Sequence, residues 1–262
     1  MPKIVTETRP LADFDRIVIQ DLGELILEPG ETNTLTIEAG EEILPEIKSE
    51  VDGRILTLGL RKKLDRWWFG FWNSRGYDEI RYRLTYRSLS ALTASGAVRV
   101  MAAKLASKDF HLSLSGAVQV GIENIQTDTL HCLVSGASRL EIGTLTAEEI
   151  HLDQSGAGVI EVNTLNGKTM KVDLSGAGKI NIGSGKVESQ SYSLSGACKV
   201  TSHDLQSSNA SLSLSGASKV SLWATDHLNI HASGASKVKY RGKPVIEQQT
   251  SGATSILAIQ GE

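Results

Sequence analysis

Three histidines recur at intervals of twenty residues, at His111, His131 and His151, and two aspartates, Asp153 and Asp173, repeat at the same interval. Side chains in register on neighbouring strands lie about 5 Å apart, close enough to share a metal ion or to perform acid–base chemistry on a sugar. A stacked row of imidazoles, however, does not converge on one ion as tetrahedral ligands must. We therefore expect no catalytic, metal-binding or cofactor-binding residues. A carbohydrate-active lyase or hydrolase centred on His151 and the two aspartates is kept as an alternative.

A second group of residues suited to binding is a short aromatic segment. It holds three of the four tryptophans and two of the four phenylalanines of the chain, namely Trp67, Trp68, Phe69, Phe71 and Trp72. If this segment is exposed between two strands, its rings form a contact for a protein or glycan partner. If it folds back, the same rings plug the open end of a solenoid, which needs such a cover.

The elements that carry these side chains are predicted by an internal repeat. The tripeptide Ser-Gly-Ala recurs with a spacing of twenty residues six times and eighteen twice, its glycines being Gly96, Gly116, Gly136, Gly156, Gly176, Gly196, Gly216, Gly234 and Gly252. Between these glycines apolar residues occur at steps of two, which is the period of a strand. Twenty residues are too few for a strand, a crossover helix and a second strand. We therefore predict an all-β, single-stranded right-handed parallel β-helix with about nine regular coils of 18 to 20 residues over residues 90–262.

The repeated tripeptide has a structural explanation. Glycine permits the positive φ of a sharp corner, and we expect the alanine, being small, to point into the bend. The serines should stack, with hydroxyls that satisfy backbone groups at the corner. Nine equivalent serines do not indicate a nucleophile, because a nucleophile needs an adjacent base and a unique environment.

Residues 1–89 lack the repeat but still show strand patterns between turn signals such as Pro29-Gly30 and Asp52-Gly53. We interpret them as an irregular β-rich cap that is continuous with the solenoid, since an open terminal coil exposes core and unpaired backbone. At the other end Gln248 and Thr250 replace aliphatic residues of the repeat, which indicates a C-terminal cap.

Basic residues recur three positions after the repeated glycine. Six of the nine positions are basic, at Arg99, Arg139, Lys179, Lys199, Lys219 and Lys237. On a β-helix they form a stripe along one face that could follow an anionic polymer. The alternative is that outward cations oppose lateral aggregation of sheets.

Composition excludes several classes of protein. Twenty-seven Lys plus Arg against thirty Asp plus Glu give a net charge of -3, so no overall field recruits nucleic acid. No apolar run is long enough for a transmembrane segment, and no signal peptide is visible at the start of the chain. The only cysteines, Cys132 and Cys198, lie about three coils apart and are expected to form no disulfide.

The repeated Ser-Gly-Ala, together with the lead-in from Arg9 to Ile17, resembles the bacterial head GIN domain family, a family of unknown function known as putative auto-transporter adhesins. The resemblance covers essentially the whole chain. It implies a β-helix, an extracytoplasmic location at the cell surface or in the periplasm, and no catalytic residues. We therefore predict a structural or adhesive binding module of the cell surface or envelope. A cytoplasmic scaffold that polymerises end to end is a further alternative, and self-association is compatible with either.

Overall fold

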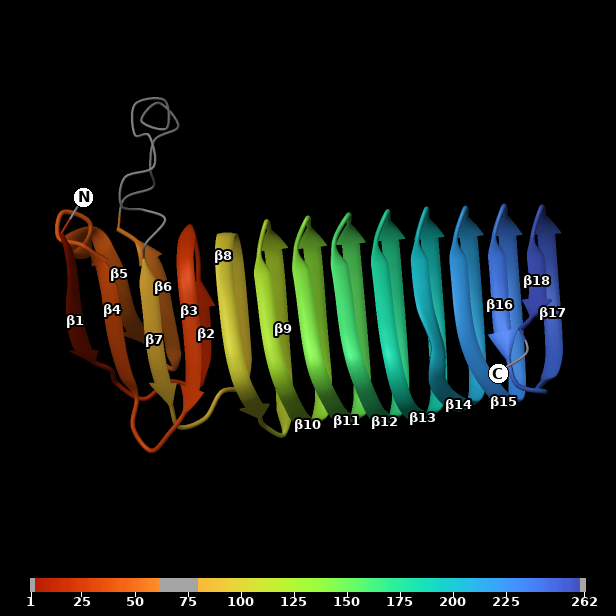
Figure 1. Cartoon of the computed structure of the whole chain (residues 1–262), viewed down its shortest axis with the longest axis horizontal. Coiled ribbons are helices and arrows are strands. Elements are labelled where there is room, and N and C mark those ends of the chain that lie inside the picture. The colour runs from red at the N-terminus through yellow and green to blue at the C-terminus, as the bar shows by residue number, and fades with distance from the viewer. Residues whose placement is uncertain (1–2, 62–79, 260–262) are drawn as a thin grey trace, which may run out of the picture.

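The computed structural model describes residues 3–61 and 80–259, and it shows one elongated rod of stacked strands (Figure 1). The described residues contain no α-helix and a single 3-10 turn, η1 (Leu44–Glu46). The strands are β1 (Ile4–Pro10), β2 (Arg16–Ile19), β3 (Leu22–Pro29), β4 (Thr34–Gly40), β5 (Ile47–Asp52), β6 (Ile55–Leu60), β7 (Arg81–Tyr86), β8 (Ala91–Ala106), β9 (Asp109–Gly116), β10 (Gln119–Gly136), β11 (Arg139–Gly156), β12 (Val159–Gly176), β13 (Lys179–Gly196), β14 (Lys199–Gly216), β15 (Lys219–Gly234), β16 (Lys237–Arg241), β17 (Val245–Gly252) and β18 (Ser255–Ala258).

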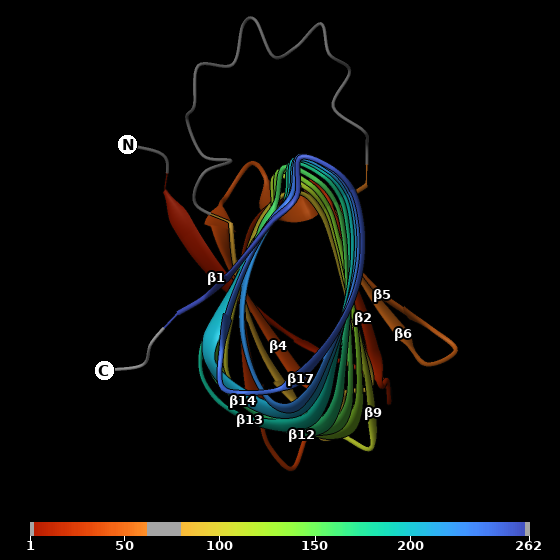
Figure 2. The ribbon, with the colours of Figure 1, turned by 90° about the vertical axis from the view of Figure 1, so that its right-hand side faces the viewer.

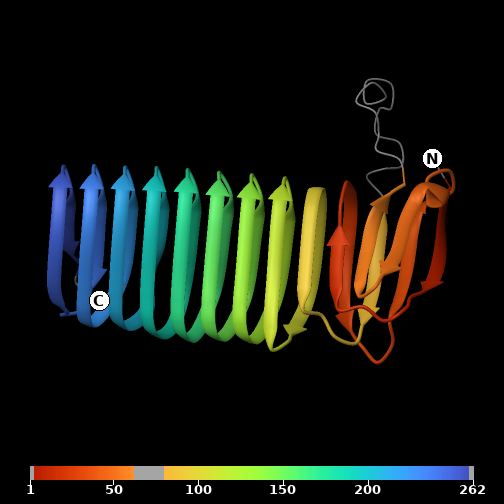
Figure 3. The same ribbon diagram turned by 180° about the vertical axis from the view of Figure 1, so that it is seen from behind.

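From β8 onward every coil pairs in parallel with the next, and equivalent residues of successive repeats lie directly over one another. Seen along the rod, the coils superpose on one closed outline (Figure 2), and the view from behind shows the same even stacking (Figure 3). Nine corner glycines, from Gly96 to Gly252, mark the ends of eight stacked coils, which is close to the predicted nine. The predicted fold class is confirmed.

Each corner depends on its glycine for two reasons. Gly136 has φ of 75°, and a Cβ atom placed there would lie 2.7 Å from the carbonyl oxygen of Gly116 in the preceding coil. That carbonyl accepts a hydrogen bond of 2.9 Å from the backbone N–H of Ala137. The serine works as predicted, because Ser135 Oγ donates to the carbonyl oxygen of Leu114 at 3.2 Å.

The expectation for the alanine is wrong. Ala137 is exposed, and the residue after it, Ser138, is the one that points into the corner and is buried. Since the chain reverses direction at the glycine, the next side chain lies on the convex side of the bend and only the second returns to the interior. Ser138 Oγ then donates to the carbonyl oxygen of Ser135 at 3.1 Å and so satisfies the inner side of the corner.

The core is a set of aliphatic columns that run the length of the rod. The inward positions predicted from the repeat are buried, including the column Val100, Val120, Leu140, Ile160, Ile180, Val200, Val220 and Val238, except that Ile256 in the last coil is half-buried. One coil departs from this pattern at Tyr192, whose hydroxyl lies 2.8 Å from Ser202 Oγ and donates at 2.6 Å to Oε1 of the buried Gln190. Ser202 stands where most other coils have larger aliphatics, and its hydroxyl supplies the second polar partner of the Tyr192 ring.

The strands before residue 89 continue the stack and then change direction. β2 and β3 pair in parallel with β8, and their corner is Asp21, a non-glycine residue with φ of 75°. β6 and β7 pair in parallel with β2 and β3, whereas β5 pairs antiparallel with β6, and β4 pairs antiparallel with both β7 and β1. The parallel stacking thus ends in antiparallel strands at this side of the rod. At the other side, β17 stacks on β15 and carries Gln248 and Thr250 exposed.

Candidate functional site

The histidine row is confirmed as a stack. The ring centroids of His111 and His131 lie 4.9 Å apart with 7° between the planes, and those of His131 and His151 lie 4.9 Å apart with 12°. The rings are therefore parallel plates on successive coils. Among the residues that the structure describes, no group of three His, Cys, Asp or Glu side chains is arranged to hold a metal ion.

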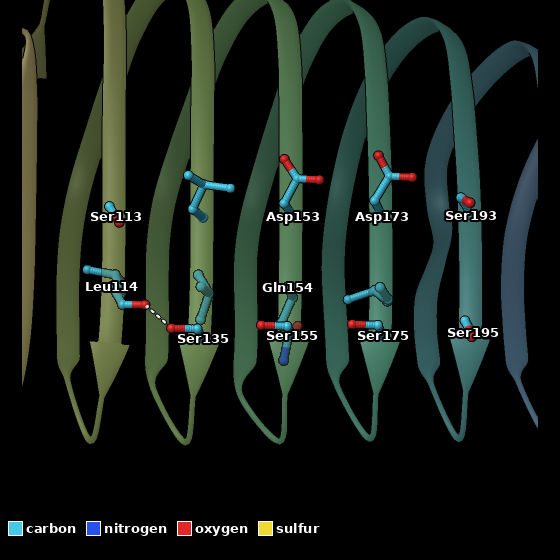
Figure 4. A pocket seen from close by; sticks show the side chains of 13 residues that line it. Ser113, Leu114, Ser135, Asp153, Gln154, Ser155, Asp173, Ser175, Ser193 and Ser195 are labelled. Atoms are coloured by element: carbon cyan, nitrogen blue, oxygen red, sulfur yellow. Dashed lines mark hydrogen bonds between the residues drawn. The ribbon is translucent and has the colours of Figure 1, made fainter.

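The two aspartates lie beside this row, in an open groove of about 440 Å³ (Figure 4). Asp153 and Asp173 are in register on β11 and β12, and their carboxylates extend in the same direction, side by side. Asp173 forms an ion pair of 3.0 Å with Lys171, whose pKa is raised by this hydrogen bond. The groove is otherwise lined largely by serines, which include Ser113, Ser135, Ser155, Ser175, Ser193 and Ser195. The two carboxylates face outward together. Acid–base cleavage of a sugar chain requires two carboxylates on opposite sides of the scissile bond, and these two do not oppose one another across the groove.

The basic row predicted from the repeat divides into two parts. Arg139 forms ion pairs with Glu161 at 3.1 Å and Glu141 at 3.5 Å, and Arg99 donates a hydrogen bond of 3.1 Å to Gln119. These arginines are therefore partnered on their own face.

The four lysines of the row behave differently. Lys179, Lys199, Lys219 and Lys237 are consecutive partners in the parallel ladder from β13 to β16, one on each coil. Within residues 3–61 and 80–259, none of the four has a carboxylate within salt-bridge distance. Lys199, Lys219 and Lys237 are exposed. This is the only run of four adjacent lysines in the described ladders, and its charge is left uncompensated.

Three of these lysines border an open groove of about 460 Å³, here named the lysine groove. Its lining consists of Lys199, Thr201, His203, Lys219, Val220, Ser221, Lys237, Lys239 and Ile259. Sequence reasoning did not select Lys239, Thr201, Ser221 or His203, although they occupy the next outward positions of the same repeat. Reading every second residue after the predicted row would have found them.

The predicted aromatic contact, Trp67, Trp68, Phe69, Phe71 and Trp72, lies outside the described residues. The fourth tryptophan, Trp223, lies on β15 beneath the guanidinium of Arg241, whose Cζ is 4.2 Å from the ring centroid. Whether the aromatic segment binds a partner or covers the first coil stays a prediction.

Both cysteines are free and buried. Burial raises the pKa of the Cys132 thiol to about 12, with a smaller contribution from the charge of Asp153. A thiol with so high a pKa is present as the unreactive neutral form at physiological pH. Cys132 therefore fills the core, as its inward position in the repeat indicates.

No helix in the described part of the chain is long and apolar enough to cross a membrane. Comparison with protein families matches residues 13–182, and again residues 135–244, to the family described as "Putative auto-transporter adhesin, head GIN domain". A search of curated proteins found no match.

Three solved structures share the fold. A putative adhesin from Parabacteroides distasonis is 18% identical with a TM-score of 0.68, and the alignment covers 98% of each chain. A protein from the same organism described as a putative lipid binding protein is also 18% identical, with a TM-score of 0.68 over 98% of this chain and 96% of that one. A putative adhesin from Parabacteroides merdae is 19% identical, with a TM-score of 0.65 over 98% and 96%. At these identities the likeness shows the fold alone.

Proposed function

Because the chain belongs to the head GIN domain family of putative auto-transporter adhesins, we propose that it is a non-catalytic binding module of the bacterial cell surface or envelope. The family and the similar structures named as adhesins support a surface binding role of this kind. An extracytoplasmic location, at the surface or in the periplasm, belongs to the same proposal.

The observation that carries the proposal is the row of lysines without ion-pair partners on a rigid face. Outward positions of a solenoid do not contribute to its core, so their side chains are free to serve contact with a partner. Arg139 of the same row pairs with neighbouring carboxylates, whereas the four lysines form no ion pair among the described residues, and Lys199, Lys219 and Lys237 are exposed. We propose these lysines as the principal contact, with Arg139 at the edge of the surface. The aromatic segment around Trp67 is a second proposed contact.

The proposal also assigns roles to the two ends of the rod. Residues 1–89 act as a cap, because their antiparallel strands end the parallel stacking. The regular coils of residues 90–262 then act as the binding rod.

Binding of the purified chain to isolated bacterial envelope fractions tests the proposal. We expect saturable binding that weakens when Lys179, Lys199, Lys219 and Lys237 are all changed to Gln. The matched control changes Lys104, Lys108, Lys168 and Lys186 to Gln, which removes the same charge away from the four-lysine row. Failure of the wild-type chain to bind any envelope fraction would refute the proposal, as would release of cleaved sugar products from those fractions.

A further inference from the structure

We propose that the lysine groove binds a linear polysaccharide that carries carboxylate groups, with the sugar chain lying along the axis of the solenoid. This inference rests on the proposed function and names the class of ligand.

The lysine groove concentrates positive charge. The groove brings together Lys199, Lys219, Lys237 and Lys239, and Lys179 extends the row by one coil. Neighbouring like charges repel, and the fold does not require lysine here, since Val159 and Ser255 occupy the same ladder position in other coils. Such a cluster in a protein with a net charge of -3 is complementary to an anionic ligand.

The spacing of the lysines also suits a linear polymer. Neighbouring coils lie about 4.8 Å apart, as in any parallel sheet, and the histidine rings measure 4.9 Å for the same repeat on another face. The ladder therefore offers one ammonium group per coil along a straight line. A chain of uronic acids offers one carboxylate per sugar, and an extended pyranose unit is similar in length to one coil. Lysine suits this task because its flexible stem lets each point charge reach a carboxylate that is not in perfect register.

The rest of the groove lining favours a sugar chain over other anionic ligands. Thr201 and Ser221 lie in the same groove and supply hydroxyl groups that can donate to and accept from sugar hydroxyls. Single-stranded nucleic acid is bound through aromatic side chains on which bases stack, and no aromatic ring other than the imidazole of His203 lines the groove among the described residues. An anionic membrane surface would favour large apolar side chains that enter the lipid, whereas the only apolar members are Val220, which is buried, and Ile259.

The test measures binding of oligogalacturonate to the full chain by isothermal titration calorimetry, with the fully methyl-esterified oligomer as the uncharged ligand. We expect binding of the charged oligomer that weakens as salt is added, and no binding of the ester. Changing Lys219 and Lys237 to Gln should weaken binding about thirty-fold, if each lysine contributes about as much as a lysine beside an anionic surface. Changing Lys108 and Lys186 to Gln should leave it unaltered, although the net charge changes equally.

Several outcomes would overturn the inference. One is equal binding of the esterified oligomer, and another is equal weakening by both pairs of substitutions. Tighter binding of single-stranded DNA, of polyphosphate or of vesicles that contain an anionic lipid would assign the lysine groove to that ligand instead. If the chain binds envelope fractions but no polyuronate, the ligand class is wrong while the binding role stands. If it binds neither, both proposals fail.

Discussion

Replacing one corner glycine by alanine should destabilise the rod far more than its single methyl group suggests. In Gly136→Ala the new side chain must adopt a φ of 75°, which costs about 1–2 kcal/mol for a residue other than glycine. Its Cβ would also lie 2.7 Å from the carbonyl oxygen of Gly116, so the two coils must separate locally. Separation weakens the hydrogen bond from Ala137 N–H to that oxygen, which contributes about 0.5–1.5 kcal/mol, and repacking adds about 1 kcal/mol. The expected loss in the free energy of unfolding is about 3 kcal/mol.

Two glycines provide controls that separate these contributions. Gly53 also has a positive φ, of 58°, but a Cβ atom there would meet nothing within 4 Å, so Gly53→Ala carries only the backbone cost. Gly121→Ala has no such backbone cost and would meet only the side chain of Met101. Urea unfolding followed by circular dichroism measures the total loss. Hydrogen exchange shows whether protection falls in the coils beside residue 136, since a solenoid can open locally. A loss in Gly136→Ala no larger than that in Gly53→Ala would refute the close-contact argument.

Two further predictions concern buried groups. In Tyr192→Phe the hydrogen bonds to Gln190 and Ser202 are lost inside the core, and we expect the free energy of unfolding to fall by about 1–3 kcal/mol without loss of strand content, which thermal unfolding and circular dichroism check. Burial raises the pKa of both Cys132 and Tyr86 to about 12, so the folded chain keeps protons that the unfolded chain releases near pH 9 and 10. The stabilising contribution of these two groups should therefore be fully present below about pH 9 and be lost as the pH rises towards 12. Iodoacetamide should alkylate Cys132 only after unfolding. Rapid alkylation of Cys132 in the native chain at pH 8 would contradict its burial.

Much of the fold followed from the sequence because one short unit is repeated many times. Each inward position is occupied by an aliphatic residue in most coils, so random exceptions in single coils do not obscure the period of two. The same redundancy identified the corner glycines and the row of lysines. The N-terminal strands have no repeat, and their pairing partners lie far away in the sequence, as for Arg16 of β2, which pairs with Ala91 of β8. Sequence patterns therefore showed that strands exist there, but not which of them turn antiparallel.

The exceptions inside the core were harder to foresee. Gln154 stands at an inward position that is aliphatic in most coils, and its side chain fills the space beside Gly158 and Gly178, where two coils lack a side chain at the corner. Its Nε2 donates to the carbonyl oxygen of Gly158. A glutamine at one position of the repeat and two glycines at another look like unrelated departures until the coils are stacked.

The sequence by itself determined the architecture: a repeat of twenty residues with strand periodicity and a glycine at one position can bury its apolar side chains only by stacking coil on coil. Only the tertiary structure decided how the outward residues differ from one another. Arginines and lysines are equivalent in the repeat, yet Arg139 lies against Glu141 and Glu161 while the lysines of β13 to β16 have one another as ladder neighbours. Glu141 lies in the same coil as Arg139, but its nearer partner, Glu161, comes from the next coil, so part of the charge around an outward side chain is set by the stacking of coils.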